Sequence, residues 1–137
     1  MQFELYADGG ARGNPGPAGA GAVVRDSNGN TVLEVSKFLG HQTNNFAEYD
    51  AVISALDGLS REVATPREVT VLVKLDSQLV VKQMTGEYKV KHPNIRPQYE
   101  KLVALVRLFK NVTFTHVPRE QNKDADRLAN QAMDRGA

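Results

Sequence analysis

Residues Val69 to Asp76 read VTVLVKLD, and this segment sets the architecture that we expect for the rest of the chain. The segment is mostly β-branched and apolar, which is typical of a central strand buried on both faces of a sheet. Asp76 closes the strand. A carboxylate at the rim of a buried sheet needs a partner, a metal ion or water to offset its lost solvation, so Asp76 is a candidate functional residue.

Three more strands are expected before this segment. Gln2–Asp8 alternates apolar and polar side chains, which predicts a strand that ends at Asp8. The glycine- and proline-rich residues 9–17 are typical of a turn. Residues 19–25 and 31–39 flank an Asn-Gly pair, and this arrangement predicts a β-hairpin.

Two further acidic residues lie near predicted helix starts. Thr43 or Asn44 can cap a helix whose apolar residues recur at helical spacing, and we place Glu48 in its first turn. Asn122 can cap a final helix, which carries Asp126 in its first turns. The sequence therefore places four acids, Asp8 and Asp76 among them, where separate segments end or begin.

The expected fold class is α/β, with a five-stranded mixed sheet in which an antiparallel hairpin joins parallel strands, flanked by helices. The remaining elements are a short helix capped by Ser77 that runs through Met84, a break at residues 86–92, a helix after Pro93, and a strand from Val112 to Val117. We expect one domain over residues 1–137. If the first and fourth strands are parallel neighbours, Asp8 and Asp76 leave the same edge of the sheet. The helix starts bring Glu48 and Asp126 to that edge.

The composition excludes several kinds of site. The chain has 137 residues, which suits one domain. Its 17 Lys and Arg against 16 Asp and Glu leave a formal charge of +1, so any affinity for nucleic acid must come from local patches. The absence of cysteine excludes disulfides and thiolate zinc sites. With neither a long apolar span nor a signal-like N-terminus, we expect a cytoplasmic protein that does not bind membranes.

Four convergent carboxylates are suited to hard cations, which prefer oxygen ligands. Mg²⁺ keeps several waters and often completes its shell with phosphate oxygens of a substrate. Two ions about 3.5–4 Å apart can activate a water on one side of a phosphorus atom and stabilise the leaving oxygen on the other. The sequence therefore predicts a metal-dependent, phosphodiester-cleaving site that needs no protein nucleophile.

Five motifs in order resemble type 1 ribonuclease H and cover nearly the whole chain. They are Tyr6-Ala7-Asp8-Gly9-Gly10, Gly13-Asn14-Pro15-Gly16, Thr43-Asn44-Asn45-Phe46-Ala47-Glu48, Asp76-Ser77-Gln78 and Asn122-Lys123-Asp124-Ala125-Asp126-Arg127-Leu128-Ala129. Each motif alone is typical of an ordinary turn or helix cap. Asp124 could also be a structural acid that favours the helix dipole, and the register of the family motif assigns the functional role to Asp126 instead.

The resemblance implies a ribonuclease H-like catalytic domain that hydrolyses the RNA strand of RNA/DNA hybrids by a two-metal-ion mechanism, leaving 5′-phosphate and 3′-hydroxyl ends. It implies Mg²⁺ as the cofactor, with Mn²⁺ as a substitute, and assigns as metal ligands Asp8, Glu48, Asp76 and Asp126. It also implies substrate contacts by Gly9, Asn14, Thr43, Asn44, Asn45 and Gln78. Amide side chains suit this role because they match the donor and acceptor character of a 2′-hydroxyl. We expect a monomer, and double-stranded RNA stays open as a second substrate.

Two departures from the family pattern concern substrate handling. Many members have a histidine in the loop before the last helix, where this chain has Pro118-Arg119-Glu120-Gln121, so we assign Arg119 as the substitute. His116 lies nearby but within the predicted last strand. The chain also lacks the Trp- and Lys-rich helix known as the basic handle, as compact bacterial and archaeal forms do. Lys89 and Lys91 are the expected reduced handle.

Two other function classes compete with this interpretation. A noncatalytic nucleic-acid-binding module could retain the fold, but the intact carboxylate quartet argues against it. An integrase or a resolvase-type nuclease would share the acids without the amide set. That set, from Asn14 and Asn44 to Gln78, favours RNA.

Overall fold

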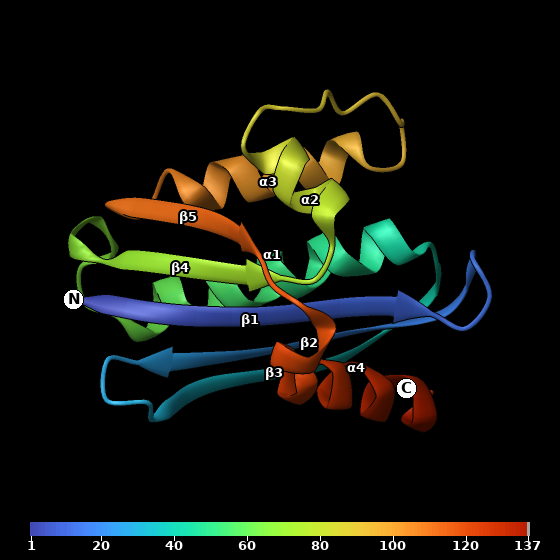
Figure 1. The fold of residues 1–137 in the computed structure, drawn as a ribbon, viewed down its shortest axis with the longest axis horizontal. Helices are drawn as coiled ribbons and strands as arrows, with labels where there is room; N and C mark the ends of the chain where they lie inside the picture. Colours follow the sequence, from blue (N-terminus) through green and yellow to red (C-terminus); the bar gives the residue numbers. More distant parts are fainter. Residues whose placement is uncertain (137) are drawn as a thin grey trace.

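The computed structural model describes residues 1–136, in which one five-stranded sheet is flanked by four α-helices (Figure 1). The strand order is β3-β2-β1-β4-β5. The strands are β1 (Gln2–Ala11), β2 (Gly16–Asp26), β3 (Thr31–Gln42), β4 (Thr70–Leu75) and β5 (Asn111–His116). The helices are α1 (Asn44–Glu62), α2 (Gln78–Met84), α3 (Arg96–Val106) and α4 (Lys123–Arg135), with short 3₁₀ turns at Pro66–Glu68 and Arg119–Gln121. The expected order of elements and the mixed sheet are confirmed.

Strand β1 lies at the centre of the sheet and joins its two halves. It is antiparallel to β2 and parallel to β4, which in turn is parallel to β5. The parallel pairing with β4 ends at Ala7 opposite Leu75. The antiparallel pairing with β2 continues to Ala11, so Asp8 lies inside β1 and the predicted strand end at Asp8 is wrong. The glycines after Asp8 remain extended because β2 supplies hydrogen-bonding partners for them.

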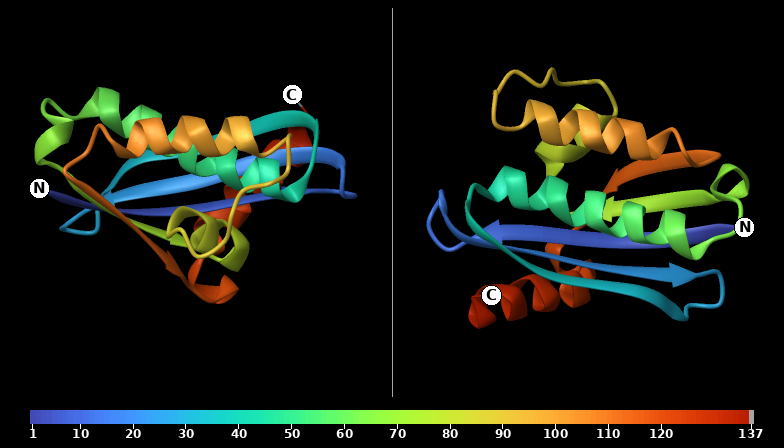
Figure 2. Two further views of the ribbon diagram at one scale, coloured as in Figure 1. Left: turned by 90° about the horizontal axis from the view of Figure 1, so that it is seen from above. Right: turned by 180° about the vertical axis from the view of Figure 1, so that it is seen from behind.

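The helices cover the two faces of the sheet unequally. Helix α1 packs across β1, β2 and β3 on one face, beside α3 (Figure 2). Helix α4 packs across β1, β2 and β3 on the other face. The main hydrophobic core lies on the α1 side and includes Leu5, Tyr49, Leu56, Val73 and Leu102. The prediction that β4 is buried on both faces is wrong, because Val71 and Val73 are 0% exposed whereas Leu72 and Lys74 are half-buried.

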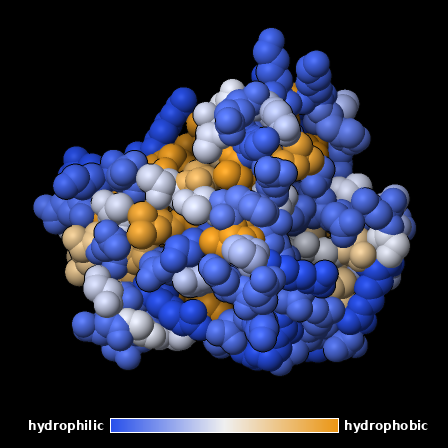
Figure 3. All heavy atoms as spheres, in the orientation of Figure 1, coloured by the Kyte–Doolittle hydropathy of each residue, from blue (hydrophilic) through white to orange (hydrophobic). Residues whose placement is uncertain are grey.

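The half-buried side of β4 lies on the same face of the sheet as α4, in the part of that face that α4 does not cover. The space-filling view of this side is mainly hydrophilic, with apolar patches between the polar groups (Figure 3). Lys74 lies here and forms an ion pair with Glu4, at 2.5 Å between Lys74 Nζ and Glu4 Oε2. The coverage of β4 therefore depends on where α4 docks.

Side-chain caps begin two of the helices as expected. Thr43 Oγ1 accepts a hydrogen bond from the Phe46 N–H at 3.2 Å, and Ser77 Oγ accepts one from the Val80 N–H at 3.3 Å. Asn122 stands at the start of α4 but makes no side-chain cap there, so that part of the prediction is wrong. No helix within residues 1–136 is long and apolar enough to cross a bilayer.

Candidate active site

One cavity of about 520 Å³ brings the four predicted acids together at the carboxyl end of β4. Asp76 directly follows β4, and Asp8 lies one residue beyond the last parallel pair of β1 with β4. Glu48 comes from α1 and Asp126 from the first turn of α4. Glu48 is the fifth residue of α1, so its predicted place in the first turn is wrong by about one residue. The cavity is lined by Asp8, Gly9, Gly10, Ala11, Arg12, Asn44, Glu48, Asp76, Arg119, Asp126, Ala129, Asn130 and Met133.

Gly9 allows the close approach of β1 and α1 that sets Glu48 beside Asp8. A Cβ atom added at Gly9 would lie 2.2 Å from the carbonyl carbon of Ala47 and 2.4 Å from the nitrogen of Glu48. Both atoms belong to the helix backbone and have no freedom to move aside. The resemblance implied a substrate contact for Gly9, and the backbone contact with α1 is a structural reason for a glycine at this position.

The crowded carboxylates hold protons more tightly than isolated ones. The pKa of Asp8 is raised from 3.8 to about 8, mainly by burial, then by a hydrogen bond with Asp126 and by the charges of the other acids. The pKa of Glu48 is raised from 4.5 to about 7 by burial, which outweighs the opposing hydrogen bond with Ser77. The negative charge of Asp76 adds to the rise. The cavity therefore favours either protons or a cation.

The donor set fits a hard cation. It consists of carboxylate oxygens at the wall of a polar cavity, which are the ligands that Mg²⁺ and Mn²⁺ use in proteins. Within residues 1–136, no group of three or more His, Cys, Asp or Glu side chains is arranged so that it could hold a metal ion by itself. Mg²⁺ does not require one, because it usually keeps several waters and binds through one or two carboxylates plus substrate phosphate oxygens.

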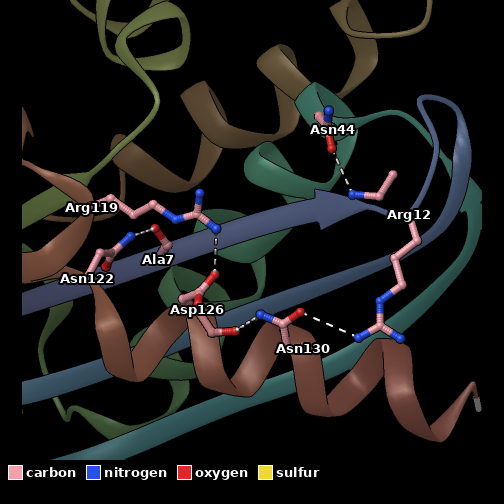
Figure 4. A network of polar contacts seen from close by, with 8 residues as sticks. Ala7, Arg12, Asn44, Arg119, Asn122, Asp126 and Asn130 are labelled. Atoms are coloured by element: carbon pink, nitrogen blue, oxygen red, sulfur yellow. Dashed lines mark hydrogen bonds and ion pairs between the residues drawn. The ribbon is translucent and has the colours of Figure 1, made fainter.

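Arg119 stands at the rim of the cavity, next to one of the acids. Its Nη2 lies 3.8 Å from Asp126 Oδ1, and its side chain is 79% exposed (Figure 4). The sequence predicted Arg119 as the substitute for the loop histidine of the family, and the structure places it within reach of the acids. His116 is exposed at the end of the edge strand β5 and does not line the cavity.

Asn122 is a positioning residue, although the local sequence pattern predicted a helix cap. Its side-chain Nδ2 donates to the carbonyl oxygen of Ala7 at 2.8 Å, and the residue is 1% exposed (Figure 4). Its backbone carbonyl accepts from the Asp126 N–H at 3.0 Å. Asn122 thus ties the residue before Asp8 to the helix turn that carries Asp126. Nothing in the local pattern distinguishes this long-range bond from a cap.

The amides named by the resemblance hold the β1–β2 hairpin against α1. The Ala11 N–H donates to Asn44 Oδ1 at 2.7 Å, and the Asn44 N–H donates to Asn14 Oδ1 at 3.1 Å. Asn44 lines the acid cavity. Gln78 is the first residue of α2 and does not line the acid cavity.

A second cavity, of about 290 Å³, lies between α1, α2 and the loop that follows α2. It brings Thr43 and Asn45 together with Lys89 and Lys91, so residues from two separate motifs of the sequence share one site. Two lysines beside a hydroxyl and an amide form a site suited to an anion.

Arg12 lines the acid cavity from the turn after β1, and the sequence motifs did not single it out. Its Nη2 lies 2.6 Å from Asp134 Oδ1 and 3.5 Å from Asn130 Oδ1, both on α4. Its position in the sequence could have indicated a site residue, because Arg12 lies between Asp8 and Asn14, which were both assigned to the site.

Comparisons with known proteins agree with this geometry. The family model described as reverse transcriptase-like matches residues 6–132. The bifunctional protein Rv2228c of Mycobacterium tuberculosis is 49% identical over 100% of the chain, which spans 37% of that protein. Ribonuclease HI of Halobacterium salinarum is 42% identical over 97% of the chain and 65% of its own length. Ribonuclease H of Geotalea uraniireducens is 34% identical, covering 98% of the chain and 95% of its own length.

Solved structures show the same fold. The N-terminal RNase H domain of Rv2228c superposes with a TM-score of 0.91 at 44% identity, covering 97% of this chain and 99% of that domain. LC11-RNase H1, solved in complex with an RNA/DNA hybrid, superposes with a TM-score of 0.92 at 45% identity, covering 97% of each chain. With five motifs in order, four acids in one cavity and these relatives along nearly its whole length, the chain belongs to the type 1 ribonuclease H family.

Proposed function

We propose that this protein is an endonuclease that hydrolyses the RNA strand of RNA/DNA hybrids with Mg²⁺, or with Mn²⁺ as a substitute. The observation that carries the proposal is the convergence of four carboxylates from β1, α1, the end of β4 and α4 on one cavity. The raised pKa values of Asp8 and Glu48, about 8 and about 7, come first from burial and then from neighbouring acids, and a divalent cation would stabilise both groups in their charged form. The family relatives named ribonuclease H and the hybrid-bound LC11 enzyme support the choice of substrate.

The residues that would hold the cations are Asp8, Glu48, Asp76 and Asp126. Cations held there would supply a more acidic water and would neutralise charge at the leaving oxygen. The water oxygen would bond to phosphorus as the bond to the 3′-oxygen breaks, and the 3′-oxygen would take up the proton that the water loses, which would leave 5′-phosphate and 3′-hydroxyl ends. Arg119 would assist product release from its place beside Asp126, because its guanidinium stays charged.

Substrate recognition would use the amides beside the acid cavity. The side-chain oxygens of Asn14 and Asn44 already accept hydrogen bonds from backbone N–H groups. Their NH₂ groups would therefore be the donors for 2′-hydroxyls. Asn45 and Gln78 would extend these contacts along the minor groove. Thr43, Lys89 and Lys91 would bind phosphate of the DNA strand at the second cavity.

The decisive experiment measures Mg²⁺-dependent cleavage of a labelled RNA/DNA hybrid beside single-stranded RNA, double-stranded DNA and double-stranded RNA. We expect selective cleavage of the hybrid by the wild type and none by Asp76→Asn, because a neutral amide binds the cation far less strongly. Asp124→Asn is the matched control, since Asp124 is an acid in the first turn of α4 that does not line the acid cavity. It should retain activity.

The alternative functions give different results in the same assay. Hybrid binding without cleavage in either Mg²⁺ or Mn²⁺ would indicate a noncatalytic module. Cleavage of double-stranded DNA in preference to the hybrid would indicate a nuclease of the integrase or resolvase kind. Cleavage of double-stranded RNA beside the hybrid would extend the substrate range without changing the site.

A further inference from the structure

Two arginines line the acid cavity among the residues the structure describes, and they lie at opposite ends of it (Figure 4). Arg119 approaches Asp126, one of the four acids. Arg12 lies at the other end, over the later turns of α4, and its ion-pair partner Asp134 does not line the cavity. Arg12 therefore lines the acid cavity, but its ion pair is with a residue outside the four acids.

The ion pair that holds Arg12 is a weak one. The side chains of Arg12 and Asp134 are 48% and 68% exposed, and ion pairs this exposed to water contribute little stability. The second contact, from Arg12 Nη2 to Asn130 Oδ1, is long at 3.5 Å. A stronger anion at the cavity can therefore displace Asp134 from Arg12 at small cost.

The backbone beneath Arg12 is firmly held, so a change of partner requires only side-chain rotation. The Arg12 N–H donates to the Pro17 carbonyl at 2.8 Å, closing the turn between β1 and β2. The neighbouring Ala11 N–H donates to Asn44 Oδ1 at 2.7 Å. On the facing helix, Asn130 Nδ2 donates to the Asp126 carbonyl at 3.0 Å, which fixes Asn130 between Arg12 and the acids (Figure 4).

We propose that Arg12 binds a phosphate of the RNA strand adjacent to the cleaved one, and that Asp134 holds Arg12 until the substrate displaces it. The inference rests on the proposed function. A phosphate next to the cleaved one lies against four carboxylates, whose repulsion must be offset. A guanidinium suits this task because it stays charged and can donate two parallel hydrogen bonds to phosphate. The RNA strand is favoured over the DNA strand because Arg12 shares its cavity with the acids, whereas Lys89 and Lys91 line a separate one.

The test is steady-state cleavage of a labelled hybrid by Arg12→Ala, Asp134→Asn and the double variant. We expect Arg12→Ala to raise KM about tenfold and change kcat by less than about twofold, as loss of a charge-assisted hydrogen bond to bound substrate would. Asp134→Asn should lower KM by roughly two- to threefold, because it releases Arg12 from a surface ion pair. The double variant should match Arg12→Ala, since Asp134 acts only through Arg12.

The matched controls are Arg25→Ala and Asp124→Asn. This pair also joins the sheet to α4 by an ion pair, but neither residue lines the acid cavity. Both variants should keep the wild-type KM. A single neutral methylphosphonate in place of one phosphate locates the contact. When this linkage lies beside the cleavage site in the RNA strand, the difference in KM between wild type and Arg12→Ala should disappear.

Three outcomes would overturn the inference. Cleavage by Arg12→Ala with the wild-type KM would exclude a substrate contact and leave the proposed function standing. Loss of the difference only when the neutral linkage is in the DNA strand would reject the assignment to RNA. Failure of the folded wild-type protein to cleave any hybrid would remove the proposed function, and this inference with it.

Discussion

Asp8 is the residue at which the cost of assembling the acid cavity is concentrated. Burial, and then the three neighbouring carboxylates, raise its pKa from the ordinary 3.8 to about 8. A group whose pKa is higher in the folded than in the unfolded state stabilises the fold at low pH. That stability declines as the pH rises from the unfolded value through the folded one. Glu48 behaves in the same direction, with a pKa of about 7.

We therefore expect the metal-free protein to lose stability as the pH rises from 5 to 9. The loss in the free energy of unfolding should be on the order of 2–4 kcal/mol, after allowance for coupling and solvent screening. Asp8→Asn should flatten this decline, because its amide does not titrate. Urea unfolding in EDTA at a series of pH values measures the effect. Asp124→Asn should retain the wild-type slope, and an equally steep slope in Asp8→Asn would contradict the assignment.

At the scale of elements, the docking of α4 on β2 fixes the position of Asp126. A Cβ atom added at Gly21 would lie 2.2 Å from the Ala125 carbonyl oxygen and 2.4 Å from the Ala129 nitrogen. Helix and strand backbones therefore meet directly, with no side chain between them. One methyl group at this contact would push the helix away from the sheet.

We predict that Gly21→Ala lowers the free energy of unfolding by about 1–3 kcal/mol, the usual cost of overpacking. It should also reduce hybrid cleavage in the fully folded fraction, because Asp126 moves with α4. Thermal unfolding and Mg²⁺-dependent kinetics measure the two effects. Gly10→Ala is the control for stability, since an added Cβ there lies 3.9 Å from its nearest neighbours. Unchanged stability in Gly21→Ala would show that the helix tolerates displacement.

The loop between α2 and α3 carries a charge patch that is separate from the acids. Replacing both Lys89 and Lys91 with Ala should weaken hybrid binding and lower the salt slope of log affinity by up to about 2, because up to two phosphate contacts are lost. The rate at saturating hybrid should be retained. Fluorescence anisotropy over a salt series tests this prediction. Lys101→Ala with Lys110→Ala removes equal charge from exposed positions that do not line that cavity, and an equal effect there would indicate nonspecific attraction.

At the scale of the whole molecule, the proposed binding of a cation by the four acids would link cation binding to folding. A cation that binds only the folded state raises stability by mass action. We expect Mg²⁺ to raise the Tm more at pH 8.5 than at pH 6, because protons compete for Asp8 and Glu48 at the lower pH. Mn²⁺ should act in the same way, and Asp76→Asn should abolish the shift. A pH-independent shift that survives in Asp76→Asn would place the cation elsewhere.

The parts of the fold that the sequence predicted are those determined by local periodicity. Alternation identified β1, and an Asn-Gly pair between two runs identified the hairpin. Helical spacing with a capping residue identified α1, and the Ser77 cap identified α2. Asp76 was identifiable because a carboxylate directly after a buried strand loses solvation that a partner, a metal ion or water must replace. The parallel pairing of β1 and β4 then brought the acids to one edge, as expected.

The errors have tertiary causes. The glycines after Asp8 have turn propensity, but pairing with β2 keeps them extended. Asn122 has cap propensity, but its side chain bonds Ala7, which is 115 residues away in sequence. The exposure of Lys74 follows from where α4 docks, which no local pattern encodes. The sequence did not predict Arg12 as a site residue, because its place beside the acids depends on a cavity that forms only in the folded protein.

The docking of α4 on the glycines of β2 also has a consequence for synthesis. Asp8, Glu48 and Asp76 are synthesised at least 50 residues before Asp126, so a growing chain carries three of the four acids while those residues are being added. The cavity is completed only when the last helix reaches a sheet that must already be paired. Long-range closure of this kind is slow relative to local helix formation. If the site acts as proposed, a growing chain would therefore be inactive toward surrounding nucleic acid until α4 has docked on the sheet.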